Sequence, residues 1–373
     1  MLVTIIVFLV ILSVLVLVHE AGHFFVAKLF GIKVEEFGFG LPPRAFGKKF
    51  GETLYSLNWL PIGGFVKLYG EDEAGAGKLQ IPNSKSEIPS SKEIKRAFFA
   101  KPIWQRFLVV FAGVFMNFVL AVAIISVLFS VVGVPMPGNK VTVNAIVKGA
   151  PADKAGLKVG DTIISVDKTS ITSAEQVVAY ARNHLGEKLT IKIQTPNSKF
   201  QIVKIAPRKV YPADEGPMGI AISQNVITQK YPWYQAPFVG TWEALKETWL
   251  IASGLVMLVI QLFTKGIVPQ GVAGPIGIAE LTGVVVGLGP SAVLSLVSLL
   301  SLNLAIINVL PIPALDGGRL FFILIEGVFR KKVNQEIEGY AHMIGMIILL
   351  GLIALITLHD LFRIITGQPI LPK

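Results

Sequence analysis

The sequence predicts an α-helical polytopic membrane protein with about four transmembrane helices, a cytoplasm-side, membrane-associated β-hairpin region and an extracytoplasmic α+β domain. Apolar residues make up 53% of the 373 residues and charged residues only 16%, with a mean hydropathy of +0.65. Soluble domains do not have this composition. Four apolar stretches also approach the roughly 20 residues with which a helix crosses the hydrocarbon core of a bilayer.

The expected elements follow one another along the chain. They are a first transmembrane helix at residues 1–30, a cytoplasmic-side loop with the membrane-associated β-hairpin at 31–102, a second transmembrane helix at 103–135, an α+β domain at 138–225, interfacial helices with a Gly/Pro turn at 226–289, a third transmembrane helix at 290–328 and a fourth at 338–362. The apolar stretch at 249–263 is short for a span, so we expect an interfacial or packed helix there, with a fifth span as the alternative.

The distribution of basic residues orients these helices. Lysines and arginines are frequent between the first two spans, and Arg330, Lys331 and Lys332 lie between the last two. By the positive-inside tendency both loops are cytoplasmic, so residues 135–290 and both termini lie outside a multi-pass cell (inner) membrane protein. No cleavage site follows the first apolar run, which we expect to be retained. The net charge of +10 fits this topology, and without a basic stripe interleaved with aromatic residues no nucleic-acid partner is expected.

A polar motif interrupts the first apolar run. His19 and His23 are one helical turn apart and project from one face, which is the spacing with which two imidazoles hold one zinc ion. Glu20 is adjacent but angularly offset, so it can act as a general base without being a ligand. The chain has no cysteine, so a metal must rely on His, Asp or Glu. A pair of hydrogen-bonded core histidines is the alternative.

A tetrahedral zinc needs a third protein ligand if a catalytic water takes the fourth position. Asp316 is the best candidate because it is the only acidic residue between Glu280 and Glu326. It follows Pro311 and Pro313, which cannot continue a regular helix, and irregular backbone at membrane depth is tolerated only where it is buried or lines a cavity. A helix cap at the membrane surface is the alternative for Asp316. The other histidines do not lie on segments that resemble a metal site: His184, His342 and His359.

The two motifs resemble those of a known family. His19-Glu20-x-x-His23 and Asn308-x-x-Pro311-x-Pro313-x-x-Asp316-Gly317 look like the signature motifs of the site-2 proteases, in the right order and in the first and third spans. More specifically, nearly the whole chain resembles bacterial intramembrane zinc metalloproteases of the regulator-of-sigma-E type. The resemblance implies that His19, His23 and Asp316 bind one Zn²⁺ per chain, that Glu20 activates water, and that a transmembrane substrate is cut within the membrane.

The segment between the first two spans also resembles part of this family. Residues from Thr53 to Leu60 alternate aromatic or β-branched with small or polar side chains, and glycines flank them, which is typical of strands and tight turns. In the family a similar stretch forms a β-hairpin that meets extended substrate by strand addition. The resemblance makes three residues of this region candidate substrate contacts: Tyr55, Gly63 and Gly64.

Three residues of the second and third spans are further substrate-binding candidates. Gly113 allows close helix approach, and Asn117 offers an amide to a carbonyl or a peptide in a dry setting. Asn308 can hydrogen-bond substrate backbone or stabilise a developing oxyanion. Helix packing without substrate contact is the alternative for these residues.

Residues 149–166 look like the centre of a PDZ domain, and a single copy is present. Pro151 begins a short helix that Gly156 ends, and a core strand follows. In the circularly permuted arrangement of bacterial PDZ domains, a peptide would add as a strand beside Gly219 and Ile220. A passive size filter that keeps folded ectodomains from the site is the alternative.

The leading hypothesis is therefore an intramembrane zinc endopeptidase, in contact with membrane lipid, whose substrates are single-span membrane proteins such as anti-sigma factors or remnant signal peptides. A non-catalytic PDZ-containing membrane scaffold predicts no bound metal, and a metal transporter is expected to carry several acidic groups along a path. A membrane metalloprotease with a glutamate as third ligand would have to use Glu326 or Glu336, which lack the proline-rich lead-in. The sequence leaves the physiological substrate, the scissile bond, the upstream protease and the oligomeric state open.

Overall fold

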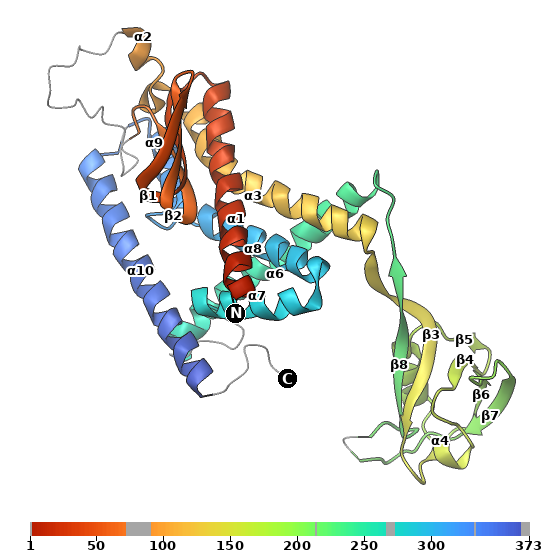
Figure 1. Ribbon diagram of the computed structural model, residues 1–373. Helices are drawn as coiled ribbons and strands as arrows, with labels where there is room; N and C mark the ends of the chain where they lie inside the picture. Colours follow the sequence, from red (N-terminus) through yellow and green to blue (C-terminus); the bar gives the residue numbers. More distant parts are fainter. Residues whose placement is uncertain (1, 72–90, 213–214, 266–272, 332, 367–373) are drawn as a thin grey trace. The chain divides into compact units, whose positions relative to one another are not determined.

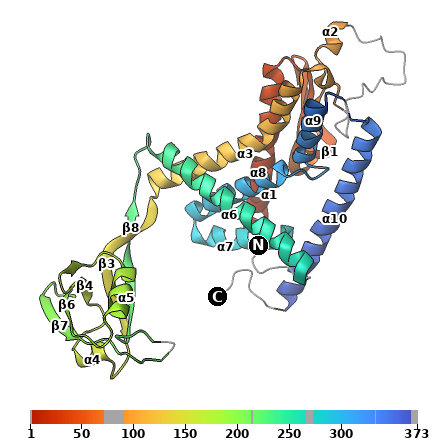
Figure 2. The same ribbon diagram turned by 180° about the vertical axis from the view of Figure 1, so that it is seen from behind.

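The structure is a computed structural model that describes residues 2–71, 91–212, 215–265, 273–331 and 333–366. The chain divides into two compact units (Figures 1 and 2). One comprises Met1–Val132 and Pro232–Lys373, and the other comprises Gly133–Tyr231.

The first unit is built on apolar helices. Within the described residues, four helices are long and apolar enough to cross a membrane, which confirms the predicted number: α1 (Leu2–Leu29), α3 (Ile103–Val131), α8 (Pro290–Val309) and α10 (Gln335–Ile365). The stretch at 249–263 belongs to a longer helix, α6 (Ala236–Lys265), which is not among the four. Ala244 of α6 is fully buried against Ala121 and Leu302, so one face of α6 packs on α3 and α8.

A β-hairpin follows α1, as the alternating pattern predicts. Strands β1 (Val34–Phe50) and β2 (Thr53–Leu68) pair antiparallel, with Phe50 opposite Thr53 at the turn. Both strands bend back on themselves, so Phe37 lies opposite both Tyr55 and Val66. The outer ends of the two strands are anchored, because Val34 and Leu68 are buried in one core cluster with residues of α1 and α3. Beyond the hairpin lie α2 (Ser91–Ile94) and a 3-10 turn, η1 (Phe98–Ala100). The hairpin therefore starts from the same core that packs α1 against α3 and α9.

The region expected as the third span is two helices. α8 ends at Val309, and α9 (Asp316–Phe329) starts at the acidic residue. Between them Pro311 and Pro313 interrupt regular helical hydrogen bonding, as their missing N–H groups require. The shorter apolar helix α7 (Pro275–Leu288) precedes α8. The predicted break thus places a carboxylate at the first turn of a new helix, and Figure 1 shows α9 beside the hairpin.

The second unit is an antiparallel sheet with two helices. Its elements in chain order are β3 (Val134–Ile146), α4 (Pro151–Lys154), β4 (Thr162–Val166), β5 (Thr169–Ser170), α5 (Ala174–Asn183), β6 (Leu189–Gln194), β7 (Phe200–Ile205) and β8 (Ile220–Gln229). The strand order is β7-β6-β4-β3-β8, and β5 pairs with β4. The unit is longer than the expected 138–225 because β3 and β8 pair out to Val134 and Gln229. Its core is formed by alternate residues of the strands, among them Val141, Ile163 and Ile191.

Candidate metal centre

The C-terminal half of α1 presents the two histidines toward the interior of the first unit. His19 and His23 are 6% and 8% exposed, and their Nε2 atoms lie 3.2 Å apart. The rings meet edge to face with centroids 4.8 Å apart. Residues four apart on a helix share a face, which explains why the motif alone brings these two atoms together.

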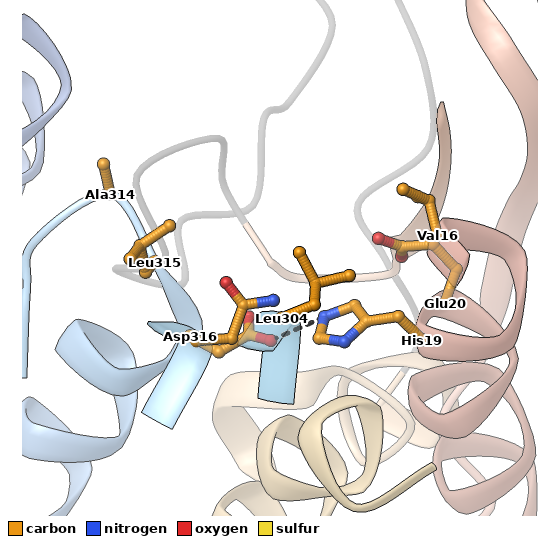
Figure 3. Close-up of a pocket in the computed structure, with 8 residues that line it drawn as sticks. Val16, His19, Glu20, Leu304, Ala314, Leu315 and Asp316 are labelled. Carbon is orange, nitrogen blue, oxygen red and sulfur yellow. Dashed lines mark ion pairs between the residues drawn. The ribbon is translucent and has the colours of Figure 1, made fainter. Parts of the chain in front are cut away.

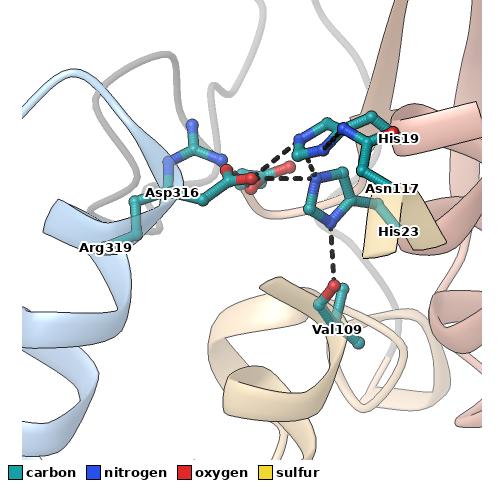
Figure 4. A network of polar contacts seen from close by, with 7 residues as sticks. His19, His23, Val109, Asn117, Asp316 and Arg319 are labelled. Atoms are coloured by element: carbon teal, nitrogen blue, oxygen red, sulfur yellow. Dashed lines mark hydrogen bonds and ion pairs between the residues drawn. The ribbon is translucent and has the colours of Figure 1, made fainter. Parts of the chain in front are cut away.

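The first turn of α9 supplies the third group. Asp316 Oδ2 lies 2.8 Å from His19 Nε2 and 3.3 Å from His23 Nε2. Figure 4 shows the carboxylate of Asp316 facing both imidazole rings. Ligands about 2.05 Å from a tetrahedral zinc ion are about 3.3 Å from one another, so the three atoms have nearly the spacing of a zinc site. Asp316 Oδ2 is buried and has no hydrogen-bond partner of suitable geometry. A buried carboxylate oxygen without such a partner is what a cation site leaves when its ion is removed.

The surroundings of the imidazoles fix which nitrogen faces the centre. The Nδ1–H of His23 donates to the carbonyl oxygen of Val109 at 2.8 Å, which leaves the Nε2 lone pair toward Asp316. Asn117 is fully buried, its amide nitrogen lies 3.4 Å from His19 Nδ1, and its Oδ1 has no partner. Because amide oxygen and nitrogen exchange on a 180° rotation, Asn117 Oδ1 can accept the Nδ1–H of His19. Both histidines then present Nε2 as a ligand atom.

Gly113 of α3 leaves the space that the imidazoles occupy. A Cβ atom at Gly113 would lie 2.4 Å from His23 Nε2 and 2.8 Å from His19 Cε1. On the neighbouring helix, a Cβ at Gly22 would lie 2.3 Å from the carbonyl oxygen of Ala112. The close approach of α1 and α3 at these two glycines is therefore a condition for the metal centre.

Two cavities adjoin the three groups. One, of about 220 Å³, is lined by His19, Glu20 and Asp316 together with Asn308 of α8 (Figure 3). The other, of about 200 Å³, is lined by Glu20, His23 and Asp316 and by Phe65 of β2. A polar group in a membrane interior needs such a cavity for access of water. Glu20 borders both cavities and is thus accessible to a reactant entering either one.

The second cavity also contains an ion pair that sequence reasoning missed. Arg319 Nη1 of α9 lies 2.7 Å from a carboxylate oxygen of Glu71, which comes directly after the hairpin. Arg319 lies one helical turn beyond Asp316. Figure 4 shows the Arg319 side chain beside the Asp316 side chain. The pair connects the chain after β2 with the helix that carries Asp316.

The remaining candidates occupy three different places. Gly64 of β2 opens toward α1, because a Cβ there would lie 3.6 Å from Leu17 and 3.8 Å from Glu20, and Gly63 lies nearest Val16. Tyr55 is 38% exposed, with its ring centroid 6.1 Å from that of Phe24 on α1. The other two belong to the second unit, at the start of β8: Gly219 and Ile220.

One histidine that the sequence did not connect with the site also contacts it. His342 of α10 accepts a hydrogen bond at Nδ1 from the backbone N–H of Ala314, at 2.9 Å. Ala314 lies two residues before Asp316 in the break between α8 and α9. No short sequence motif could predict this contact, because 28 residues separate the partners.

Fold and site together define a class: a metalloprotease whose zinc site lies within a helical membrane protein. The model of peptidase family M50 matches residues 7–352. A protein of Clostridium acetobutylicum that is provisionally named a zinc metalloprotease is 34% identical over 348 residues. These residues cover 93% of this chain and 94% of that protein. Zinc metalloprotease RasP of Oceanobacillus iheyensis is 29% identical over 426 residues, covering 97% and 99% of the two chains.

The chain belongs to peptidase family M50, the site-2 protease family. It is a zinc metalloprotease with zinc as its cofactor, and the resemblance read from its two motifs is confirmed. The protein is therefore an enzyme and not a non-catalytic scaffold.

Proposed function

We propose that the protein hydrolyses peptide bonds within the transmembrane segments of single-span membrane proteins, such as anti-sigma factors or remnant signal peptides. The observation that carries this proposal is the position of the histidine motif in a long apolar helix. His19 and His23 lie inside α1, whose residues 2–29 form an apolar helix long enough to cross a membrane. A peptide bond that reaches Glu20 is thus expected to lie within the lipid boundary.

The residues around the site have distinct roles in this reaction. A bound zinc ion supplies Lewis acidity, which activates water and polarises the scissile carbonyl. His19, His23 and Asp316 would hold the ion. Glu20 accepts the proton of the attacking water and later returns it to the leaving amine. Asn308 lines the cavity beside His19 and Glu20, where its amide can donate to the substrate backbone or to the developing oxyanion.

The hairpin is the element that we expect to present the substrate. At Gly63 and Gly64, β2 passes α1 next to Val16 and Glu20 with no side chain in between. A protease needs extended backbone at the scissile bond, and an extended segment can add as a strand beside another strand. Tyr55, exposed on the same strand, then contacts side chains of the unwound segment.

The second unit is proposed to be a PDZ domain on the extracytoplasmic side of the cell (inner) membrane. Its strand β8 lies at the edge of the sheet, and α5 contacts this strand. Gly219, at a φ of +69°, turns the chain into β8 immediately before Ile220. A peptide that adds beside these residues fits this edge, and a size filter against folded ectodomains is the alternative role.

Cleavage of a model substrate tests the proposal. The full chain, purified in detergent or reconstituted in lipid, is incubated with a single-span protein, and the cut is mapped by mass spectrometry. We expect a cut inside the apolar segment for the wild type and none for Asp316→Ala or His23→Ala. Cuts confined to the polar flanks of the substrate would contradict an intramembrane site.

A further inference from the structure

The last helix of the first unit is the least enclosed of the four candidate spans. In the most apolar 18-residue segment of α10, only 6% is buried, compared with 22–44% for the corresponding segments of α1, α3 and α8. Near its C-terminal end, Asp360 accepts hydrogen bonds from the backbone N–H groups of Gly274 and Gly277 at the start of α7, at 3.0 and 2.8 Å. A polar contact of α10 with the site region lies near its N-terminal end, at the break before Asp316. Figures 1 and 2 show α10 set off from the other long helices along much of its length.

At that break, α10 bonds to a strained piece of backbone. Ala314 has a φ of +80°, in the left-handed region that residues with a Cβ adopt at a cost. Its N–H donates to His342 Nδ1 at 2.9 Å, and the His342 ring also meets Phe322 of α9 with centroids 5.7 Å apart. The histidine therefore contacts both the loop before Asp316 and the helix after it.

Gly345 contacts the same loop without an intervening side chain. A Cβ there would lie 2.4 Å from the carbonyl oxygen and 2.6 Å from the Cβ of Pro313. Gly345 is three residues beyond His342, so the two residues lie on one face of α10. By contrast, a Cβ at Gly351, farther along the helix, would meet nothing within 4 Å.

We propose that α10 positions the third zinc ligand, with His342 and Gly345 holding the loop at 310–315 so that Asp316 points at His19 and His23. The inference rests on the proposed role of these three residues as the metal site. Asp316 follows Ala314 by two residues, so a shift of the loop is passed directly to the carboxylate. Zinc coordination tolerates displacements of only about 0.2 Å, and α10 is therefore a positioning element for catalysis although it contributes no ligand.

Two alanine substitutions on α10 test this inference. Gly345→Ala and Gly351→Ala are the same change in the same helix, but only the first meets the loop. For Gly345→Ala we expect transfer of zinc to a chelator to accelerate about tenfold or more, and kcat to fall by a similar factor at nearly constant KM. For Gly351→Ala we expect both quantities to stay within about twofold of the wild type.

The hydrogen bond is tested separately at His342. His342→Phe keeps a ring against Phe322 but lacks the acceptor, whereas His342→Asn offers Oδ1 close to the place of Nδ1. We expect faster zinc loss for the phenylalanine variant and recovery for the asparagine variant, with His359→Asn on the same helix as the unchanged control.

Zinc retention separates failure of this inference from failure of the proposed function. If neither Gly345→Ala nor His342→Phe releases zinc faster than Gly351→Ala and His359→Asn, while the wild type binds zinc and cleaves, α10 has no positioning role. If the wild type binds zinc no better than His23→Ala, the metal site itself is wrong.

Discussion

Replacement of Gly113 by alanine is the sharpest steric test of the metal centre. The added Cβ would lie 2.4 Å from His23 Nε2, whereas ordinary contacts begin at 3.4 Å. The imidazole must therefore move by about 1 Å, five times the tolerance of about 0.2 Å for a zinc ligand. The movement also strains the 2.8 Å hydrogen bond between His23 and the Val109 carbonyl.

The expected result is a zinc affinity at least 100-fold lower than that of the wild type. Loss of an outer hydrogen bond alone costs about 10–100-fold, and displacement of a ligand exceeds that range. The factor of 100 corresponds to about 2.7 kcal/mol of binding free energy. Competition with a chromophoric chelator measures the dissociation constant, and Gly287→Ala, whose Cβ meets nothing within 4 Å, is the matched control. A folded Gly113→Ala variant with a dissociation constant within threefold of the wild type would refute the geometry.

Three further predictions follow from single side chains. Glu20→Gln keeps zinc but lowers kcat by about 10²–10⁴-fold, because proton transfer is lost; a steady-state assay that finds wild-type turnover removes Glu20 from the mechanism. Asn117→Ala lowers zinc affinity by about 10–100-fold, and Asn117→Asp, which keeps an acceptor for the neighbouring imidazole, restores most of it; equal chelator competition by both variants would contradict the orienting role. At the hairpin turn, hydrogen bonds from Arg96 and Lys28 lower the pKa of Glu52 from 4.5 to about 2. The lowered pKa means that these two ion pairs stabilise the fold fully above pH 4.5 and lose their effect as the pH falls toward 2. Glu52→Gln should therefore lower the melting temperature by about 2 °C at pH 7 and by less with each step below pH 4.5. A difference in melting temperature that stays constant down to the acid limit would show that the ion pairs of Glu52 have no part in it.

The parts of the site that depend on local spacing were predictable from the sequence. His19 and His23 share a helix face by periodicity alone, and Pro311 and Pro313 force the break after which Asp316 begins α9. The contact between His342 and Ala314 was not predictable. It depends on how α10 packs, and nothing in the local sequence of α10 encodes a distant loop.

Two helix and strand boundaries differed for physical reasons. Hydropathy marked only residues 249–263, but α6 begins at Ala236, since Pro237 is compatible with the first turn of a helix. Alternation marked the strand at Thr53 to Leu60, yet β1 and β2 pair over a longer stretch that includes the basic residues Lys48 and Lys49. Pairing with β2 extends β1 through these basic residues, which the alternation of residue types did not predict.

The ion pair of Arg319 with Glu71 shows the same limit. Both side chains are charged residues that a sequence reader assigns to solvent, and 248 residues separate them. Their meeting beside Asp316 follows from the hairpin packing on α1 and from α9 starting at the carboxylate. Long-range packing, rather than residue type, decides such contacts.

X-ray absorption at the zinc edge of the purified protein tests the central claim most directly. We predict one zinc ion per chain with two imidazole nitrogens at about 2.0–2.1 Å and carboxylate or water oxygens at about 2.0–2.2 Å. The spectrum of Asp316→Ala should lose the carboxylate oxygen or the metal altogether. A wild-type spectrum with a single imidazole, or one unchanged in Asp316→Ala, would contradict the convergence of the two helices on one ion.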